Sequence, residues 1–389
     1  MNILHLVGFY PEIGGPFSVI KELLIKLSQK GINIKILSPI PKNYDKEKLN
    51  FVKKLPFEVE YIEEQLPRFI MPSFSLVFNK RIKELSKYFD LIHLAGIFDF
   101  YSIPVVSMDL KFIYSSHGTF MKEAYKMMKL KKMKKDFYMN IIGKKILKKA
   151  NRIHLLTQEE REHFLEFYPE FENKIRVVPN GLDLSQYEVS LSKSDLINKY
   201  PNLKDKKIIL FLSRINWKKG LDILIPAFAK LHNEDKSFHL LIAGKDDGDG
   251  YEKKARQWVS EYGLSDTVTF AGLLTGRDKF MAFYGSDVFV LPSYSEGLPT
   301  AVIEAMVCGI PIVVSDKVGI SREIMQYNAG TIVKTDLDDV YNGIKNVFSN
   351  LDKAKEMALN GKKMVHNLYD INKVADEMIK MYEEAIDSH

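Results

Sequence analysis

Two carboxylates lie eight positions apart at the start of an apolar segment. Glu296 and Glu304 belong to the run SEGLPTAVIE, residues 295–304, and the neighbours of Glu304 within residues 301–307 are all apolar. A carboxylate in such surroundings is costly unless a partner or a ligand compensates it. A loop carboxylate followed by a solvated helical residue would explain the spacing without any function. The apolar neighbours favour a functional pair, with Glu296 facing a ligand and Glu304 accepting hydrogen bonds from a diol.

The same run predicts the start of a helix directly after a strand. Gly297 permits a tight turn, and Pro299 suits the first helical turn because its missing N–H costs no hydrogen bond there. The glycine and proline within residues 308–311 end this helix. The free amides from Leu298 to Ala301, including that of Thr300, can bind a phosphate.

Two cations follow another predicted strand. Arg214 and Lys219 belong to the run SRINWKKG, residues 213–220, which comes after the apolar residues 207–212. Cations at a strand end, followed by a helix start, can clamp a diphosphate. The order of Lys219 and the glycine after it does not fit a P-loop, which ends in Gly-Lys-Ser/Thr. A solvated basic loop would explain the run alone, but together with the carboxylate run it favours a binding site.

The first half of the chain carries weaker signals. The pair Gly14-Gly15 would let the backbone approach a ligand closely, although a simple turn explains it equally well. His117 follows the strand predicted at 112–115, so we expect it at the ligand-binding end of a sheet rather than as a polar cap. Asn180 lies where the first half ends, and a turn there is at least as good an explanation as ligand contact.

Signals for a metal or a dinucleotide are weak. Asp247-Gly248-Asp249 has the form of a metal-binding D-x-D, but its glycine-rich surroundings predict a loop. The histidines show no metal-ligand spacing, and G-x-G-x-x-G is absent from the sequence. We therefore expect neither a metal nor a cofactor.

Short apolar runs alternate with helical patterns along the chain, and the pattern restarts in the second half. Continuous apolar runs indicate strands buried on both faces, and their alternation with helices indicates parallel sheets. The polar stretch 183–205 is predicted to join the halves, and 342–386 to be helical with a break at Gly361. Predicted strands are 3–7, 32–38, 91–94, 112–115, 152–156, 207–212, 239–243, 268–270, 288–291 and 312–315, and predicted helices include 18–29, 221–231 and 251–262.

Composition places the chain among ordinary globular proteins. Of 389 residues, 46% are hydrophobic and 27% charged, and the net charge is +6. That charge is too small to demand nucleic acid, and we expect none as a partner. The single cysteine, Cys308, excludes an internal disulfide and indicates a reducing compartment. The N-terminus lacks the pattern of a signal peptide, so the expected location is the cytoplasm.

One segment concentrates the positive charge. Residues 121–150 contain eleven lysines against two acidic residues, and Leu130, Met133, Phe137 and Ile141 have helical spacing. A basic amphipathic helix suits the anionic inner face of a membrane, which would make the protein peripheral. A helix packed on the core with a solvated lysine face fits the pattern equally well.

Taken in order, these residues resemble glycosyltransferase family 4. The resemblance rests on Gly14-Gly15, His117, Asn180 with its neighbours, Arg214 with Lys219, and the E-x7-E pair. It implies the GT-B fold, an α/β architecture of two Rossmann-like doubly wound domains facing a central cleft. The acceptor-binding domain would comprise 1–182, with the helix 364–389 crossing back onto it. The nucleotide-sugar domain would comprise 183–363.

The resemblance also implies roles for the candidate residues. Arg214 and Lys219 would neutralise the diphosphate, with Gly15 packed against it. Glu296 and His117 would contact the donor sugar, and Glu304 would bind the ribose. The remaining expected contacts are Leu273 to the base, Leu298, Pro299 and Thr300 to the nucleotide, and Gly14, Gly297 and Asn180 to sugar or acceptor.

The resemblance implies transfer of a sugar from a nucleotide-sugar, with retention of configuration and without a metal. The donor is expected to be a UDP-sugar only because UDP-sugars are frequent donors in the family. The acceptor would be a saccharide or a lipid-linked saccharide. A sugar phosphorylase or a nucleotide-sugar epimerase would share the fold. A non-catalytic binder of membranes or nucleic acid would be built on the basic segment instead.

Overall fold

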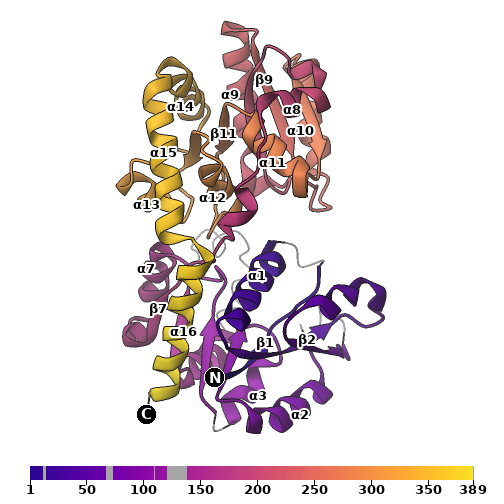
Figure 1. Ribbon diagram of the computed structural model, residues 1–389, viewed down its shortest axis with the longest axis vertical. Coiled ribbons are helices and arrows are strands. Elements are labelled where there is room, and N and C mark those ends of the chain that lie inside the picture. The colour runs from indigo at the N-terminus through magenta and orange to yellow at the C-terminus, as the bar shows by residue number, and fades with distance from the viewer. Residues whose placement is uncertain (12–14, 67–72, 109, 121–137, 389) are drawn as a thin grey trace. The chain divides into compact units, whose positions relative to one another are not determined.

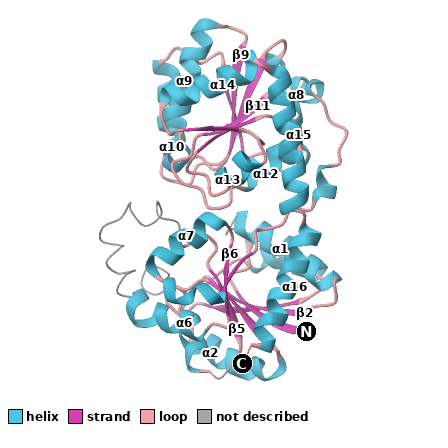
Figure 2. Ribbon diagram, turned by 90° about the vertical axis from the view of Figure 1, so that its left-hand side faces the viewer, coloured by secondary structure: helices cyan, strands magenta, loops and turns pink. Residues whose placement is uncertain are grey.

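The computed structural model describes residues 1–11, 15–66, 73–108, 110–120 and 138–388, and these form two compact units. Unit 1 comprises residues 1–183 and 370–389, and unit 2 comprises residues 184–369. In each unit, helices lie on both sides of a parallel sheet (Figures 1 and 2). This confirms two doubly wound α/β halves.

The sheet of unit 1 has seven parallel strands in the order β3-β2-β1-β4-β5-β6-β7. Alternate residues of β1 enter different cores, with Ile3 packing on one face and Leu4 and Leu6 on the other. That two-sided burial explains the continuous apolar runs. The strands are β1 Asn2–Leu6, β2 Asn33–Ile40, β3 Glu58–Glu63, β4 Leu91–Ala95, β5 Phe112–Ser115, β6 Arg152–Leu155 and β7 Ile175–Val177. The helices are α1 Gly15–Gln29, α2 Leu76–Leu85, α3 Ser102–Ser107, α6 Lys144–Lys149, α7 Gln158–Phe167 and α16 Ile371–Asp387.

The sheet of unit 2 has six parallel strands in the order β10-β9-β8-β11-β12-β13. The strand order reverses between β8 and β11, and such a switch point is where open α/β sheets bind ligands. The strands are β8 Lys207–Leu212, β9 Phe238–Ala243, β10 Val268–Gly272, β11 Val288–Leu291, β12 Ile312–Ser315 and β13 Thr331–Val333. The helices are α8 Lys193–Lys199, α9 Leu221–Glu234, α10 Tyr251–Glu261, α11 Gly276–Gly285, α12 Thr300–Val307, α13 Ser321–Gln326, α14 Leu337–Ser349 and α15 Leu351–Leu368.

A directed chain of hydrogen bonds fixes the last helix, α16, to the sheet of unit 1. It ends at the carbonyl of Val178, which can only accept, so His154 must donate from Nε2 (2.7 Å). Ser115 then donates to His154 Nδ1 (2.7 Å), His93 donates from Nε2 to Ser115 (2.6 Å), and the Tyr382 hydroxyl of α16 donates to His93 Nδ1 (2.9 Å). These directions hold because burial lowers the pKa of both histidines, so that each ring is neutral and the chain of hydrogen bonds defines its tautomer.

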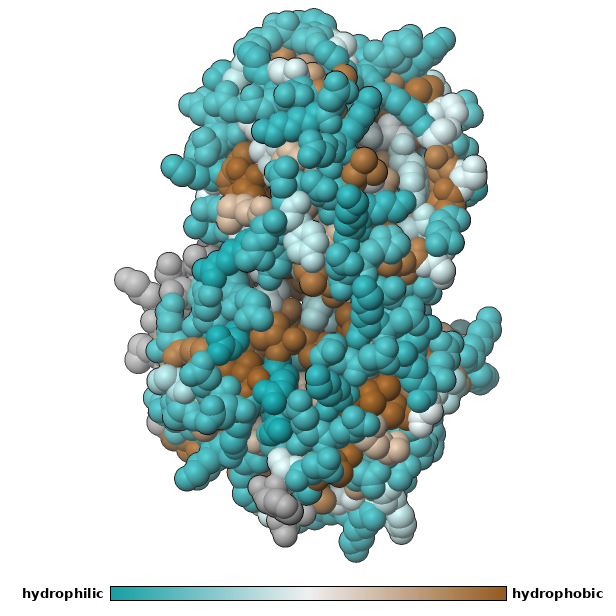
Figure 3. All heavy atoms as spheres, turned by 60° about the vertical axis from the view of Figure 1, so that its left-hand side comes forward, coloured by the Kyte–Doolittle hydropathy of each residue, from teal (hydrophilic) through white to brown (hydrophobic). Residues whose placement is uncertain are grey.

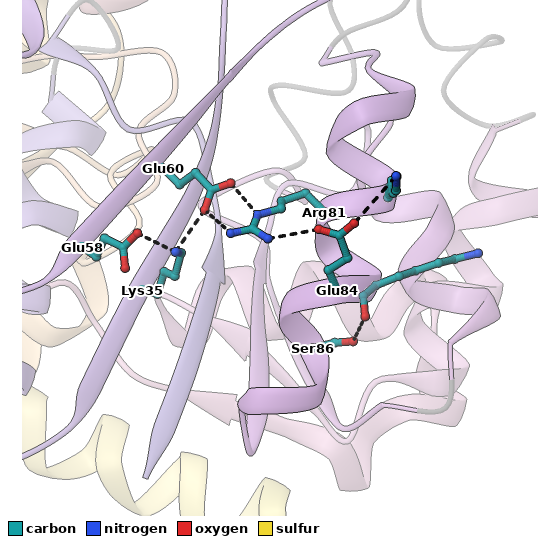
Figure 4. Close-up of polar contacts among 8 residues, drawn as sticks. Lys35, Glu58, Glu60, Arg81, Glu84 and Ser86 are labelled. Atoms are coloured by element: carbon teal, nitrogen blue, oxygen red, sulfur yellow. Dashed lines mark hydrogen bonds and ion pairs between the residues drawn. The ribbon is translucent and has the colours of Figure 1, made fainter.

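An ionic network secures the edge of the same sheet (Figure 4). Lys35 of β2 contacts Glu58 and Glu60 of β3 at 2.6 and 3.0 Å. Arg81 of α2 donates to both oxygens of Glu60, at 2.6 and 3.1 Å, and to Glu84 at 3.0 Å. The edge strand β3 is thereby tied both to its neighbour and to a helix.

The structure corrects three predictions about chain organisation. Residues 183–205 are not a join, because unit 2 begins at Leu184 and α8 packs against α11, where Leu196 meets Gly285. Gly361 does not break a helix. It lies inside α15, where a Cβ would stand 3.1 Å from Met306 of α12, so the glycine permits close helix packing. The helix breaks fall at Asn350 and at 369–370, and unit 2 extends to Tyr369 rather than ending at 363.

Much of the surface seen in Figure 3 is hydrophilic, with apolar residues in separate patches. Within the described ranges, the structure contains no helix long and apolar enough to cross a membrane.

Candidate active site

The loop after β8 is held in a conformation that buries one of its cations. Gly220 has a φ of +75° and a Cβ on it would lie 2.2 Å from the carbonyl oxygen of Pro292, so the loop packs directly against the loop after β11. Asn216 caps the short helix 217–219 by accepting from the Lys218 amide at 3.0 Å. As a result the side chain of Lys219 is only 9% exposed.

Lys219 donates to Glu296, which joins the two strongest motifs of the sequence. Glu296 follows β11, the neighbour of β8 across the switch point. Its amide donates to the Lys317 carbonyl at 3.1 Å, and its carbonyl accepts from the Gly319 amide at 2.9 Å. Backbone bonds on both sides of the residue thus fix the carboxylate, which is 14% exposed.

Arg214 is the exposed cation of the group. It donates to both oxygens of Asp247, at 3.2 and 3.1 Å, and its side chain remains 69% exposed. Asn216 donates to the same carboxylate at 2.7 Å. Asp247 lies in a loop, as predicted, and it orients Arg214 while leaving most of the guanidinium open to an anion.

Helix α12 begins where the sequence predicts. Pro299 is its N-cap and Thr300 its first residue, and the first amides of a helix have no partner within it. Leu298 and Gly297 immediately precede this N-terminus. The helix therefore offers amide donors and the positive end of its dipole beside Glu296.

Glu304, inside α12, is 7% exposed and has two partners from other elements. The hydroxyl of Tyr187 donates to its Oε1 at 2.6 Å, and Lys279 of α11 contacts the same oxygen at 2.5 Å.

Leu273, the residue predicted to contact a base, follows β10 and is 65% exposed. An exposed leucine beside a strand end is available to pack on a flat ligand.

In unit 1, His117 lies in a tight turn after β5. Its φ is +47°, which is unfavourable for any residue but glycine, and Gly118 follows at +82°. The buried carboxylate of Glu160, on α7, accepts from the Ser116 hydroxyl at 2.6 Å and from the Leu156 amide at 3.0 Å. One side chain therefore holds both the residue before His117 and the first residue after β6.

The pKa values in this turn follow from burial. Burial, together with His154, lowers the pKa of His117 to about 4, so the imidazole is neutral at pH 7. Burial also raises the pKa of Glu160, although the hydrogen bonds that its carboxylate accepts act to lower it.

The other residues predicted in unit 1 lie elsewhere in the fold. Gly15 is the first residue of α1 and Asn180 is half-buried beyond β7, whereas Gly14 falls outside the described residues.

Sequence reasoning missed Tyr187, Lys279 and Glu160. The first two lie far from Glu304 along the chain and carry no motif, so only the packing of α11 and of the segment at 184–187 reveals them. Glu160, in contrast, lies in a sequence pattern from which its position could have been predicted. It is the third residue after Thr157 in the capping pattern T-x-x-E, and the Thr157 hydroxyl does accept from its amide at 3.1 Å.

Two family models match the chain, one in each half. Residues 13–186 match Glycosyltransferase Family 4, and residues 192–364 match Glycosyl transferases group 1. Sucrose-phosphate synthase from Thermosynechococcus elongatus superposes with a TM-score of 0.79 over 98% of both chains at 19% identity. The chain belongs to the GT-B glycosyltransferases.

This glycosyltransferase also resembles other structures and sequences. The Anabaena protein HepE, solved in complex with UDP and glucose, matches at 17% identity over 98% of both chains with a TM-score of 0.78. An uncharacterised glycosyltransferase of Methanocaldococcus jannaschii is 28% identical over 60% of both chains. D-inositol 3-phosphate glycosyltransferase of Nocardia farcinica is 25% identical over 83% of this chain and 74% of the relative. The match to the archaeal relative thus spans less than two thirds of its length.

Proposed function

We propose that this glycosyltransferase transfers a hexosyl group from a UDP-sugar to a saccharide or lipid-linked saccharide, with retention of configuration and without a metal. The observation that carries the proposal is the Lys219–Glu296 contact at the switch point of the unit 2 sheet. It places a fixed cation, a fixed carboxylate and the N-terminus of α12 at adjacent strand ends. These are the groups that a diphosphate joined to a polyhydroxylated sugar requires.

The charges suit the departure of a diphosphate. When the bond between the anomeric carbon and phosphate breaks, negative charge grows on the phosphate and positive charge on the sugar. Lys219, the exposed face of Arg214 and the amides at Thr300 would stabilise the first charge. Glu296 would hold sugar hydroxyls. These three groups can neutralise the negative charge that a divalent ion neutralises in other enzymes, which supports metal-independent transfer.

Retention is proposed through front-face substitution. The acceptor oxygen bonds to the anomeric carbon on the face that the nucleoside diphosphate leaves, and the acceptor proton passes to the leaving phosphate oxygen. Glu304 is engaged by Tyr187 and Lys279, so the E-x7-E pair does not supply an acid and a nucleophile as in glycoside hydrolases. NMR of the first-formed product tests this, since an inverted anomeric centre would contradict retention.

Uridine as the base and a lipid-linked acceptor are supported by what related proteins bind. HepE was solved with UDP and glucose. A Campylobacter jejuni relative, 29% identical over 64% of this chain and 65% of its own, is named as an N-acetylgalactosaminyltransferase acting on a diphospho-undecaprenol saccharide. We extend both properties to this chain. The roles of His117, Asn180 and Gly15 on the sugar, acceptor and diphosphate belong to the same proposal.

Attachment to an anionic membrane through the basic segment 121–150 would suit such an acceptor. Leu130, Met133 and Phe137 lie outside the described residues, but α6 exposes Lys144, Lys145, Lys148 and Lys149 on one side, and Ile141 just before it is also exposed. Co-sedimentation with phosphatidylserine vesicles at low and high salt tests the proposal. Absence of binding at low salt would contradict it.

Nucleotide binding provides the main test. Calorimetry with UDP, GDP and ADP should show UDP binding most tightly, and Arg214→Ala should weaken that binding about tenfold or more. Lys204→Ala is the matched control, because Lys204 is exposed before the opposite end of β8. If none of the three nucleotides binds, or if Arg214→Ala binds as the control does, the proposed donor site is wrong. Activity that needs inorganic phosphate, or no acceptor, would favour a phosphorylase or an epimerase.

A further inference from the structure

Glu304 lies inside an apolar helix, yet it keeps one oxygen unused. Val302, Ile303, Ala305 and Met306 around it are buried, and both partners of the carboxylate, Tyr187 and Lys279, converge on Oε1. Among the described residues, Oε2 makes no hydrogen bond, and it is not one of the buried polar atoms that lack a partner. One oxygen is therefore anchored while the other remains accessible.

The two donors are themselves fixed. The Tyr187 carbonyl accepts from the Tyr284 hydroxyl at 2.5 Å, and its ring packs edge-on against Phe280 with centroids 5.1 Å apart. Phe280 is adjacent to Lys279 on α11, so both anchors of Glu304 are supported by the same helix. The ammonium of Lys279 also offsets a carboxylate charge that would be costly to bury alone.

We infer that Lys279 and Tyr187 are positioning residues that aim Glu304 Oε2 at the ribose hydroxyls of the donor nucleotide. This inference rests on the proposed function. Anchoring Oε1 fixes the rotation of the carboxylate, so that Oε2 accepts from the 2′-hydroxyl without losing freedom on binding. A site built this way rejects a nucleotide that lacks the hydroxyl, because the bound nucleotide would then shield Oε2 from water without giving it a donor. The consequence is selection of ribonucleotides over deoxyribonucleotides.

A double-mutant cycle tests the inference. It removes an anchoring side chain of the protein, the 2′-hydroxyl of the nucleotide, or both. Calorimetry compares UDP with 2′-deoxy-UDP on the wild-type chain, Lys279→Met and Tyr187→Phe. The wild type should bind UDP at least about tenfold more tightly than 2′-deoxy-UDP. In Lys279→Met this ratio should approach one through weaker UDP binding, with 2′-deoxy-UDP affinity little changed. Tyr187→Phe should reduce the ratio partially.

Controls separate positioning from mere stabilisation. Arg277→Met removes another cation of α11, one whose side chain is 69% exposed and 3.5 Å from Asp195, and should leave the ratio unchanged. Where Lys279→Met melts well below the wild type, Tyr187→Phe decides, because it removes a hydroxyl and no charge.

A purely structural role predicts equal losses for both nucleotides, and that result would overturn the inference, as would an unchanged ratio in both variants. A wild-type chain that binds UDP without preferring it to the deoxy form would overturn the inference but leave the proposed function standing. A chain that binds none of UDP, GDP and ADP would overturn both.

Discussion

Gly220 shows how a single residue position controls the diphosphate loop. Its φ of +75° alone disfavours any side chain, and the carbonyl of Pro292 leaves no room for one. Gly309 has nearly the same φ, +74°, but nothing lies within 4 Å of where its Cβ would be. An alanine at Gly309 would therefore introduce backbone strain alone, whereas an alanine at Gly220 would introduce the same strain and a steric clash.

We predict that Gly309→Ala lowers the free energy of unfolding by about 1–2 kcal/mol, the cost of a left-handed alanine. Gly220→Ala should cost more, and it should also weaken UDP binding because the clash displaces the loop that carries Lys219. Urea denaturation and calorimetry measure the two effects. Equal losses of stability in the two variants, with UDP binding retained, would show that the contact with Pro292 does not hold the loop.

The candidate site could be predicted from the sequence only where its residues follow buried strands. Lys219 and Glu296 lie in the loops that follow β8 and β11, and parallel strands bring their carboxyl ends to one edge, so their meeting follows from the pattern. Lys279 and Tyr187 reach Glu304 through helix packing, which no local pattern encodes. The positive φ of His117 also has no signal beyond the glycine that follows it.

At the scale of elements, burial explains which strands the sequence reveals. The strands at 112–115, 207–212, 288–291 and 312–315 are continuous apolar runs, and the structure has them at these bounds. The prediction missed β3, β7 and β13, which all lie at sheet edges; β3 has the sequence EVEYIE, and the other two have only three residues each. An edge strand has fewer apolar positions, and β3 is held partly by charge (Figure 4).

That charge network makes a testable contribution to the stability of unit 1. Arg81→Met should lower the free energy of unfolding only slightly at pH 7, because the Arg81 side chain is 35% exposed and solvent screens its bond to Glu60. Lys80→Met is the control, since Lys80 is 82% exposed and 4.0 Å from Glu84. Urea denaturation measures both.

The effect of Arg81→Met should depend on pH. The hydrogen bond from Arg81 is the largest cause of the lowered pKa of Glu60, so its stabilisation is present above the ordinary glutamate pKa of about 4.5 and is lost as Glu60 becomes protonated below it. The difference between wild type and Arg81→Met should therefore shrink below pH 4. A difference that is the same at pH 7 and pH 3 would contradict this account.

At the scale of the whole molecule, the two units differ in how many histidines with a lowered pKa lie among their described residues. In unit 1, burial lowers the pKa of His5 to about 3 and those of His117 and His154 to about 4, and it also lowers that of His93. In unit 2, burial lowers the pKa of His239 to about 4 and that of His232 to a lesser extent. Glu160 opposes the trend in unit 1, because its pKa is raised.

Unit 1 should therefore lose stability faster than unit 2 as the pH falls from 6.5 to 5. A histidine whose folded pKa is depressed binds its proton more readily in the unfolded chain, so its stabilisation is complete above the ordinary pKa of 6.5 and declines below it. Each such proton contributes at most about 1.4 kcal/mol per pH unit. Unit 1 has two more such histidines than unit 2, and Glu160 opposes their effect in part. Unfolding of unit 1 should therefore take up about one to two more protons than unfolding of unit 2.

Hydrogen exchange, corrected for intrinsic rates, measures the opening free energy of each unit separately. His5→Leu should reduce the acid sensitivity of unit 1 by about one proton, because His5 is buried, its Nε2 has no hydrogen-bond partner, and leucine does not titrate. His366→Gln, an exposed substitution on α15, is the control and should change neither unit. If both units lose protection in parallel, or if His5→Leu is as acid-sensitive as the wild type, then the buried histidines of unit 1 do not set its response to acid.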